Sequence, residues 1–531
     1  MKDYLNAAFT FFFLLFIIII SLTFLQSYKQ DFTSIVDFDL TVIHNSLQLV
    51  SNEYPDYTDH TGYAQFLING ITYKIVQIFD QNLITNIKLL TNFENPEIVL
   101  QKLYIISRIL NSTLLFITLI FLFKVFDKFK IKNYLKYFFI ITITLTETFW
   151  SNFTVLRADV LSICFYWISF YYLINFLKNR KIIDLFFVSF FMVFSLLAKV
   201  QIIFLFMFMF FFFIFYFIYE KENITTLDYS NIFFKSFNIR YKYITLSIII
   251  IYFLFQFYLN NFVNSSSPIG YFDAILFAIY FLIMYLTIFF LGKRIVNKSY
   301  LYEIFSIILF FSILVIIFMK FLNILNILQI DFNIIFSLTN PFYFLKSYST
   351  FIDKEFSLII FFEMFSLLIK YPKVELVYLF ILSIILFTCI YQIFLRKKKI
   401  NYNFIYIILF CLIAIFLIAL NNFRFLIIYN LYLIPIFFLL SGIFLSTLKK
   451  RTELICSSLF FLFLLANIFV KTNNYKIYVF KESNMEYVCK NNIRVSNIAI
   501  RNFYNMWAKN FNEDFFKKIC LNKKLIFLQT E

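Results

Sequence analysis

Long apolar runs, separated by short polar or basic stretches, are the main pattern along this chain. The first run covers residues 7–25, which is long enough to cross the hydrocarbon core of a bilayer as one helix. No small-x-small cleavage signal follows this run, so we expect a retained first helix and not a removed leader. The pattern predicts an all-α polytopic membrane protein.

Basic clusters between the apolar runs orient the predicted helices, because Lys and Arg in short loops stay on the cytoplasmic side. With the N-terminus cytoplasmic, the first helix crosses outward and residues 26–103 form a large exterior loop. Residues 322–373 are also expected outside, with the stretch around Glu363 as an interfacial helix, since a charge at mid-bilayer costs about 2.5–3.5 kcal/mol. About 13 transmembrane helices result, at residues 7–25, 104–123, 137–151, 159–177, 182–198, 200–219, 243–259, 271–291, 301–321, 374–395, 404–420, 425–445 and 454–470.

This topology divides the chain into a transmembrane domain, residues 1–470, and a more polar exterior C-terminal segment, residues 471–531. Cys489 and Cys520 lie in that segment, where an oxidising compartment permits a disulfide, and their pairing stays open. The other cysteines fall in predicted helices as buried apolar residues: Cys164, Cys389, Cys411 and Cys456. No Cys or His spacing suggests a metal site.

Composition narrows the class of protein further. The chain is 62% hydrophobic and 15% charged, and its net charge of +17 comes from clusters between apolar runs. Membrane topology explains that charge, so we expect no nucleic-acid partner. The chain has five glycines and six prolines, which leaves few of the broken helices that transporters use for substrate binding and disfavours a transporter.

An acidic stretch follows the first predicted helix. Asp37 and Asp39 precede a helix that apolar residues at helical spacing imply, and His60 lies further along the same exterior loop. One aspartate could cap that helix, but a single cap does not need both. His44, beside the apolar stripe, is expected to be structural. The residues that define the stripe are Leu40, Ile43, Leu47 and Val50.

Four charged residues are predicted at the exterior ends of other helices, namely Arg157, Asp159, Lys199 and Arg424. Each cation alone could be an interfacial residue whose head reaches water. Together they face the same side as the acidic loop, where the positive-inside rule makes basic residues exceptions. Cations at the membrane surface suit the phosphate of a departing polyprenyl phosphate, and an adjacent aspartate could accept a proton from the acceptor hydroxyl.

The layout resembles the C-type glycosyltransferase superfamily (GT-C), in particular the bacterial branch related to protein O-mannosyltransferases and aminoarabinose lipid A transferases. The stretch "DFD" resembles the acidic motif of the first exterior loop, and "YTDHTGY" resembles a downstream HPG or HPP element, with Thr61 where proline is usual. "RAD", "LLAKVQ" and "FRFLIIYNLYLIP" resemble later elements of the family. The resemblance extends over about residues 1–446 and implies a sugar donor linked to polyprenyl phosphate and a lipid, glycan or protein acceptor.

Together these arguments predict a glycosyltransferase of the inner (cytoplasmic) membrane with an exterior C-terminus. Asp39 is the first choice for the catalytic base and Asp37 the second, and a divalent cation could bind between them. Two rivals stay open: a polytopic transporter or lipid flippase, and a non-catalytic envelope assembly protein. The sugar, the acceptor, the metal dependence and the oligomeric state also stay open. The residues expected to bind substrate are His60, Arg157, Asp159, Lys199 and Arg424.

Overall fold

The structure of the chain is a computed structural model of residues 1–531. It describes residues 2–29, 39–53, 55, 62–93, 95–153, 155–179, 181–199, 431–432 and 434–447, with single residues at 202, 205, 209, 307, 308, 311, 312, 314, 315, 318 and 458. Every regular element in these ranges is a helix: α1 (Lys2–Lys29), α2 (Thr41–Val50), α3 (Tyr63–Phe79), α4 (Ile87–Thr91), α5 (Pro96–Lys128), α6 (Asn133–Thr144), α7 (Glu147–Phe153), α8 (Ala158–Asn179), α9 (Ile182–Ala198) and α19 (Ile434–Thr447).

Three of the described helices are long and apolar enough to cross a membrane, at Asn6–Tyr28, Pro96–Lys128 and Ala158–Asn179, and Ile182–Ala198 is a shorter apolar helix. They confirm the prediction of a helical membrane protein. Most of the other spans in the predicted count of about 13 lie outside the described residues. The predicted exterior loop, residues 322–373, and the predicted exterior tail, residues 471–531, also lie outside them.

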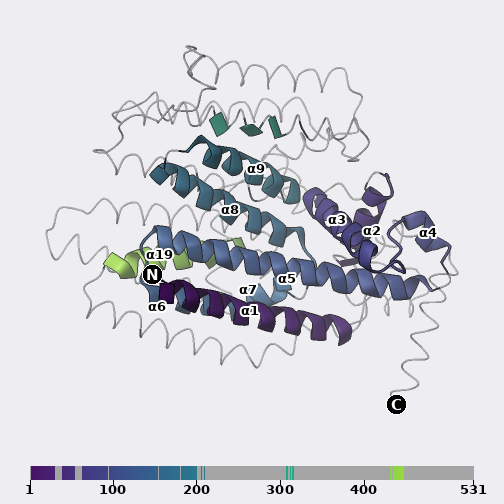
Figure 1. Cartoon of the computed structure of the whole chain (residues 1–531), viewed down its shortest axis with the longest axis horizontal. Coiled ribbons are helices and arrows are strands. Elements are labelled where there is room, and N and C mark those ends of the chain that lie inside the picture. The colour runs from purple at the N-terminus through teal and green to yellow at the C-terminus, as the bar shows by residue number, and fades with distance from the viewer. Residues whose placement is uncertain are drawn as a thin grey trace, which may run out of the picture.

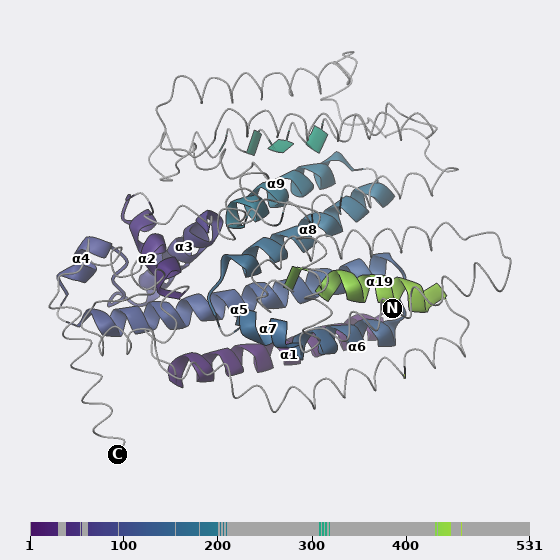
Figure 2. The same cartoon turned by 180° about the vertical axis from the view of Figure 1, so that it is seen from behind.

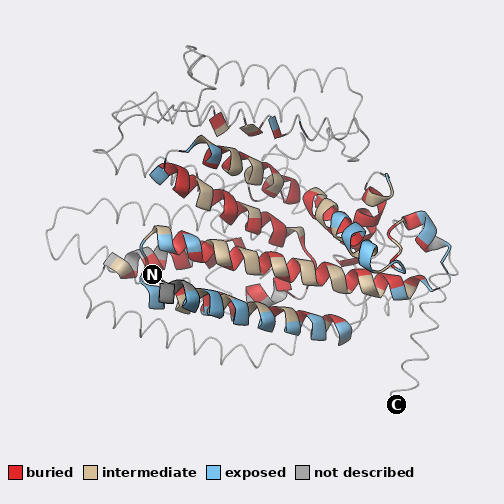
Figure 3. Ribbon diagram, in the orientation of Figure 1, coloured by how far each residue is buried: buried red, intermediate tan, exposed pale blue. Residues whose placement is uncertain are grey.

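The long helices lie in layers, with α1 and α5 in one and α8 and α9 in the next, while α2, α3 and α4 gather at one end (Figure 1). Seen from behind, α6, α7 and α19 cover the opposite face of α5 (Figure 2). Burial differs between the layers. Helix α1 exposes many apolar side chains, whereas α8 is mostly buried (Figure 3). An exposed apolar helix suits contact with lipid, and a buried one suits the centre of a bundle.

Small polar residues join neighbouring helices inside the bundle. The Thr23 hydroxyl of α1 donates to Ser112 Oγ of α5 at 2.7 Å. The Ser195 hydroxyl of α9 donates to the Ser162 carbonyl oxygen of α8, and the Ser162 hydroxyl donates back to the Ser195 carbonyl oxygen at 3.0 Å. Small residues that let backbones approach and bond across helices are typical of membrane bundles. Here they bring the start of α8 close to the end of α9.

Helix α5 is longer than its predicted span because it begins before the apolar run. Pro96 occupies its first turn, where a missing N–H costs nothing, so residues 96–103 belong to the helix and not to the predicted loop. At the other end Lys130 adopts a left-handed φ of 55°. The Ile131 N–H then donates to the Phe126 carbonyl oxygen at 3.1 Å and the Lys130 N–H to that of Asp127, which is the Schellman arrangement.

The prediction of one continuous helix at residues 137–151 is wrong, because the chain forms α6 and α7 with a break between them. Thr146 lies at the break. Its side-chain oxygen accepts a hydrogen bond from the Phe149 N–H at 3.2 Å, which satisfies a donor at the start of α7. Local side-chain bonding by threonine therefore competes with helix continuation in a stretch whose apolar pattern does not show it.

Candidate functional site

Asp39 forms a buried ion pair with Arg108 of α5. Its Oδ2 lies 2.7 Å from Arg108 Nη2 and 3.2 Å from Nε, while the Leu156 N–H donates to Oδ1 at 2.5 Å. Both charged side chains are at most 1% exposed. The Arg108 guanidinium also lies over the Tyr104 ring, 4.4 Å from its centroid. This pair joins the segment before α2, the first half of α5 and the loop between α7 and α8.

These contacts bear on both interpretations of Asp39. Helix α2 has Leu40 at its N-cap without a side-chain cap hydrogen bond, so the capping interpretation of Asp39 is wrong. Burial raises the pKa of the Asp39 carboxyl, and the Arg108 guanidinium and the Leu156 N–H oppose that rise. A raised pKa suits a proton acceptor, but the carboxylate is fully buried and both of its oxygens already accept hydrogen bonds.

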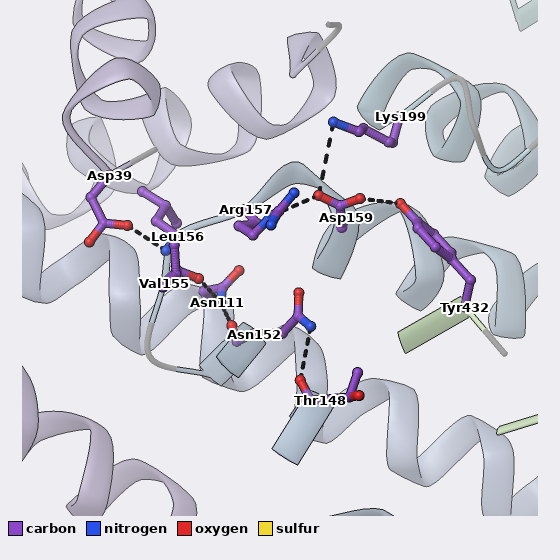
Figure 4. A network of polar contacts seen from close by, with 10 residues as sticks. All are labelled: Asp39, Asn111, Thr148, Asn152, Val155, Leu156, Arg157, Asp159, Lys199 and Tyr432. Atoms are coloured by element: carbon purple, nitrogen blue, oxygen red, sulfur yellow. Dashed lines mark hydrogen bonds and ion pairs between the residues drawn. The ribbon is translucent and has the colours of Figure 1, made fainter. Parts of the chain in front are cut away.

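Asp159, in the first turn of α8, is the centre of a second buried cluster (Figure 4). Arg157 Nε donates to Asp159 Oδ2 at 3.0 Å, and Lys199 Nζ lies 4.0 Å from the same oxygen. The Tyr432 hydroxyl donates to Asp159 Oδ1 at 2.6 Å. The side chains of Arg157 and Asp159 are at most 2% exposed, and that of Lys199 is 8% exposed. Three of the residues predicted for substrate binding therefore meet around one carboxylate.

Lys199 is positioned by the end of α9. The helix stops at Ala198, and Lys199 takes an extended conformation with φ −156° and ψ 118°, while its N–H still donates to the Ser195 carbonyl oxygen. An ammonium group carries three N–H donors. The single contact of Lys199 Nζ within the described part of the chain is the 4.0 Å ion pair with Asp159. Its donors are thus well placed for an additional anion.

The segment that carries Arg157 is held from both sides. Asn111 of α5 donates its amide N–H groups to the carbonyl oxygens of Asn152 and Val155, at 2.8 and 3.3 Å. The Asn152 amide donates in turn to the Thr148 carbonyl oxygen within α7, at 2.9 Å. Because the Leu156 N–H binds Asp39, this one short segment connects both charged clusters (Figure 4).

Two members of the clusters were not predicted, Arg108 and Tyr432. Arg108 had a signal, since it is the one charged residue in the apolar run 104–123 and an ionisable residue in a membrane helix marks a functional site by default. Tyr432 lies in the stretch "FRFLIIYNLYLIP", but nothing there distinguished it from the other tyrosines of the chain, which number 37 in all.

The remaining predicted site residues lie outside the described part of the chain: Asp37, His60 and Arg424. His44 is fully buried on α2, in line with a structural role. Among the described residues no group of three or more His, Cys, Asp or Glu side chains could hold a metal ion. Asp39 fits a divalent cation poorly, because three N–H donors already occupy its oxygens.

No protein-family model matches the sequence, and no curated protein matches it either.

Proposed function

We propose that this chain is an integral-membrane glycosyltransferase that transfers a sugar from a polyprenyl-phosphate donor on the exterior face of the cytoplasmic membrane. The acceptor would be a lipid, a glycan or a protein. The observation that carries the proposal is the buried arrangement of Arg157 and Lys199 around the single carboxylate of Asp159.

Buried charges are costly beside apolar helices and persist mainly where function requires them. A bundle with lipid-exposed helices can receive the isoprenoid tail, and cations at its end can receive the phosphate that follows the tail. Among the described residues, two cations, Arg157 and Lys199, share the one carboxylate of Asp159, which leaves an excess of positive charge. That balance favours an anionic ligand over a neutral or cationic one.

In the proposed reaction, the bond between the anomeric carbon and the phosphate oxygen breaks, and the phosphate leaves with the electron pair. Arg157 and Lys199 stabilise the charge that develops on it, with Arg424 as a third candidate. A hydroxyl of the acceptor forms the new glycosidic bond and gives its proton to a carboxylate. No step runs through a metal.

The contacts of Asp39 favour Asp37 as the proton acceptor. Asp39 is held by Arg108 and by the Leu156 N–H, which suits a residue that positions the loop ahead of α2. Turnover of a lipid-linked sugar by Asp37→Asn and Asp39→Asn tests this assignment. We expect Asp37→Asn to lose turnover at an unchanged Tm and Asp39→Asn to lower the Tm. Unchanged turnover in both single variants and in the double variant would refute carboxylate catalysis by this loop.

Binding of polyprenyl phosphate tests the anion site directly. Lys199→Met removes the charge and keeps a side chain of similar length, and we expect its Kd for polyprenyl phosphate to rise about tenfold or more, which is 1.4 kcal/mol per factor of ten. Lys136→Met is the matched control, because Lys136 is also a buried lysine in an ion pair, with Asp127 on α5. Equal Kd values for the two variants would refute the anion site.

A further inference from the structure

Helix α3 carries two buried amide side chains that the proposed anion site does not use. Gln65 and Asn69 are one helical turn apart, so they share a face of α3, and both are fully buried. Within the described part of the chain, none of their four side-chain nitrogen and oxygen atoms has a hydrogen-bond partner. Buried polar groups in folded proteins nearly always have partners, so two adjacent exceptions call for an explanation.

Helix α3, which carries these amides, packs against the two helices whose ends hold the cation cluster. Helix α3 contacts both α8 and α9, and its N-terminal end lies beside the end of α9 in both views (Figures 1 and 2). The amides and the ammonium group therefore lie at the same end of the bundle.

The chemistry of the pair suits a neutral ligand rich in hydroxyl groups. Each amide offers two N–H donors and an acceptor oxygen without net charge. A phosphate would prefer cations, and an isoprenoid chain offers nothing to bond. Asn45 of α2, also fully buried, shows the contrast, because its amide N–H donates to the Thr41 carbonyl oxygen at 2.7 Å. The unsatisfied amides are thus a feature of this face of α3 and not of every buried amide nearby.

We infer that Gln65 and Asn69 form the subsite for the sugar of the donor, beside a phosphate held by Lys199. The inference rests on the proposed function and adds to it the residues that recognise the transferred group. Before the donor binds, the amides stay unsatisfied, and sugar hydroxyls supply the missing partners on binding.

Affinity for lipids with and without a sugar tests this inference. The probes are polyprenyl phosphate and a panel of polyprenyl phosphates that each carry one hexose or pentose, titrated against the full chain in nanodiscs. We expect the wild type to bind at least one sugar-bearing lipid about tenfold more tightly than the sugar-free lipid. Gln65→Met and Asn69→Leu, which replace the amides by apolar groups of similar size, should abolish that preference and leave the Kd for the sugar-free lipid within about twofold.

Stability separates a ligand subsite from a structural role. Because the amides have no partners, we expect the Tm of the ligand-free variants to equal or exceed that of the wild type. Asn45→Leu is the control, and it should lower the Tm and keep the preference for the sugar-bearing lipid. A wild type that binds neither lipid refutes the proposed function itself. A wild type without preference, or variants that retain the preference, would overturn the sugar subsite while the anion site stands.

Discussion

The pair Asp39 and Arg108 gives the sharpest test of the buried charge network. Arg108→Met removes the guanidinium and leaves the Asp39 carboxylate fully buried, with the Leu156 N–H as its remaining donor among the contacts described above. Removing one partner of a buried pair costs about 3–5 kcal/mol, because the remaining charge is uncompensated. We expect a loss of that size in the free energy of unfolding, measured on the full chain in detergent by tryptophan fluorescence.

A double-mutant cycle separates this pairing from general damage to the fold. In Asp39→Asn/Arg108→Met no charge is left unpaired. The double variant should therefore lose about 1–3 kcal/mol less unfolding free energy than the sum of the two single losses. Arg108→Lys is the matched control, because it keeps the charge and loses the two-point contact. Its free energy of unfolding should lie between those of the wild type and Arg108→Met. Additive losses would refute the argument that the two side chains compensate each other.

The same pair predicts a pH dependence. Burial raises the pKa of Asp39 in the folded state, so the folded protein binds more protons than the unfolded chain between the ordinary carboxyl pKa and the raised one. Stability from this group is present below the ordinary pKa and falls as pH rises through the raised value. Arg108→Met removes the opposing cation, so its stability should recover markedly on acidification from pH 8 to pH 5. A variant whose loss is the same at both pH values would contradict this mechanism.

Three other substitutions test the packing and the site through the free energy of unfolding. Gly70→Ala should cost about 1–3 kcal/mol, because the new methyl group would lie 2.5 Å from Val50 Cγ1 and 3.2 Å from the Ser46 carbonyl oxygen. Lys130→Gly should gain about 0.5–1 kcal/mol, since glycine adopts the left-handed φ of 55° without steric cost. Tyr432→Phe should cost about 1.5–3 kcal/mol, the usual contribution of a hydrogen bond to a charged group, because it removes the bond to the Asp159 carboxylate.

The last two of these substitutions each have a matched comparison. Asn52 also adopts a positive φ, of 60°, at the end of α2, but asparagine tolerates that conformation. Asn52→Gly should therefore change stability less than Lys130→Gly, and an equal gain would contradict the explanation by steric cost. Tyr28→Phe is the control for Tyr432→Phe, because the Tyr28 side chain near the end of α1 is 74% exposed. Equal losses for the two would count against the hydrogen bond to Asp159.

The apolar pattern of the sequence alone determined where the long helices lie. Runs of apolar residues of spanning length predicted α1 and α8, and residues 182–198 match α9 at both ends. The helical spacing of Leu40, Ile43 and Leu47 likewise predicted α2. These features are local, because helix formation depends on side chains within a few turns of each other. The sequence alone is therefore enough to predict them.

The pairing of the charged residues was decided by the tertiary structure. Arg157 and Asp159 are two residues apart, and the sequence placed both at the start of one helix without predicting their ion pair. Asp39 and Arg108, by contrast, are 69 residues apart, and Tyr432 and Asp159 are 273 residues apart. Periodicity shows which face of a helix is apolar but not which helices pack together or at what height. The long-range pairs therefore depend on the docking of whole helices, which places these few polar groups together away from lipid and water.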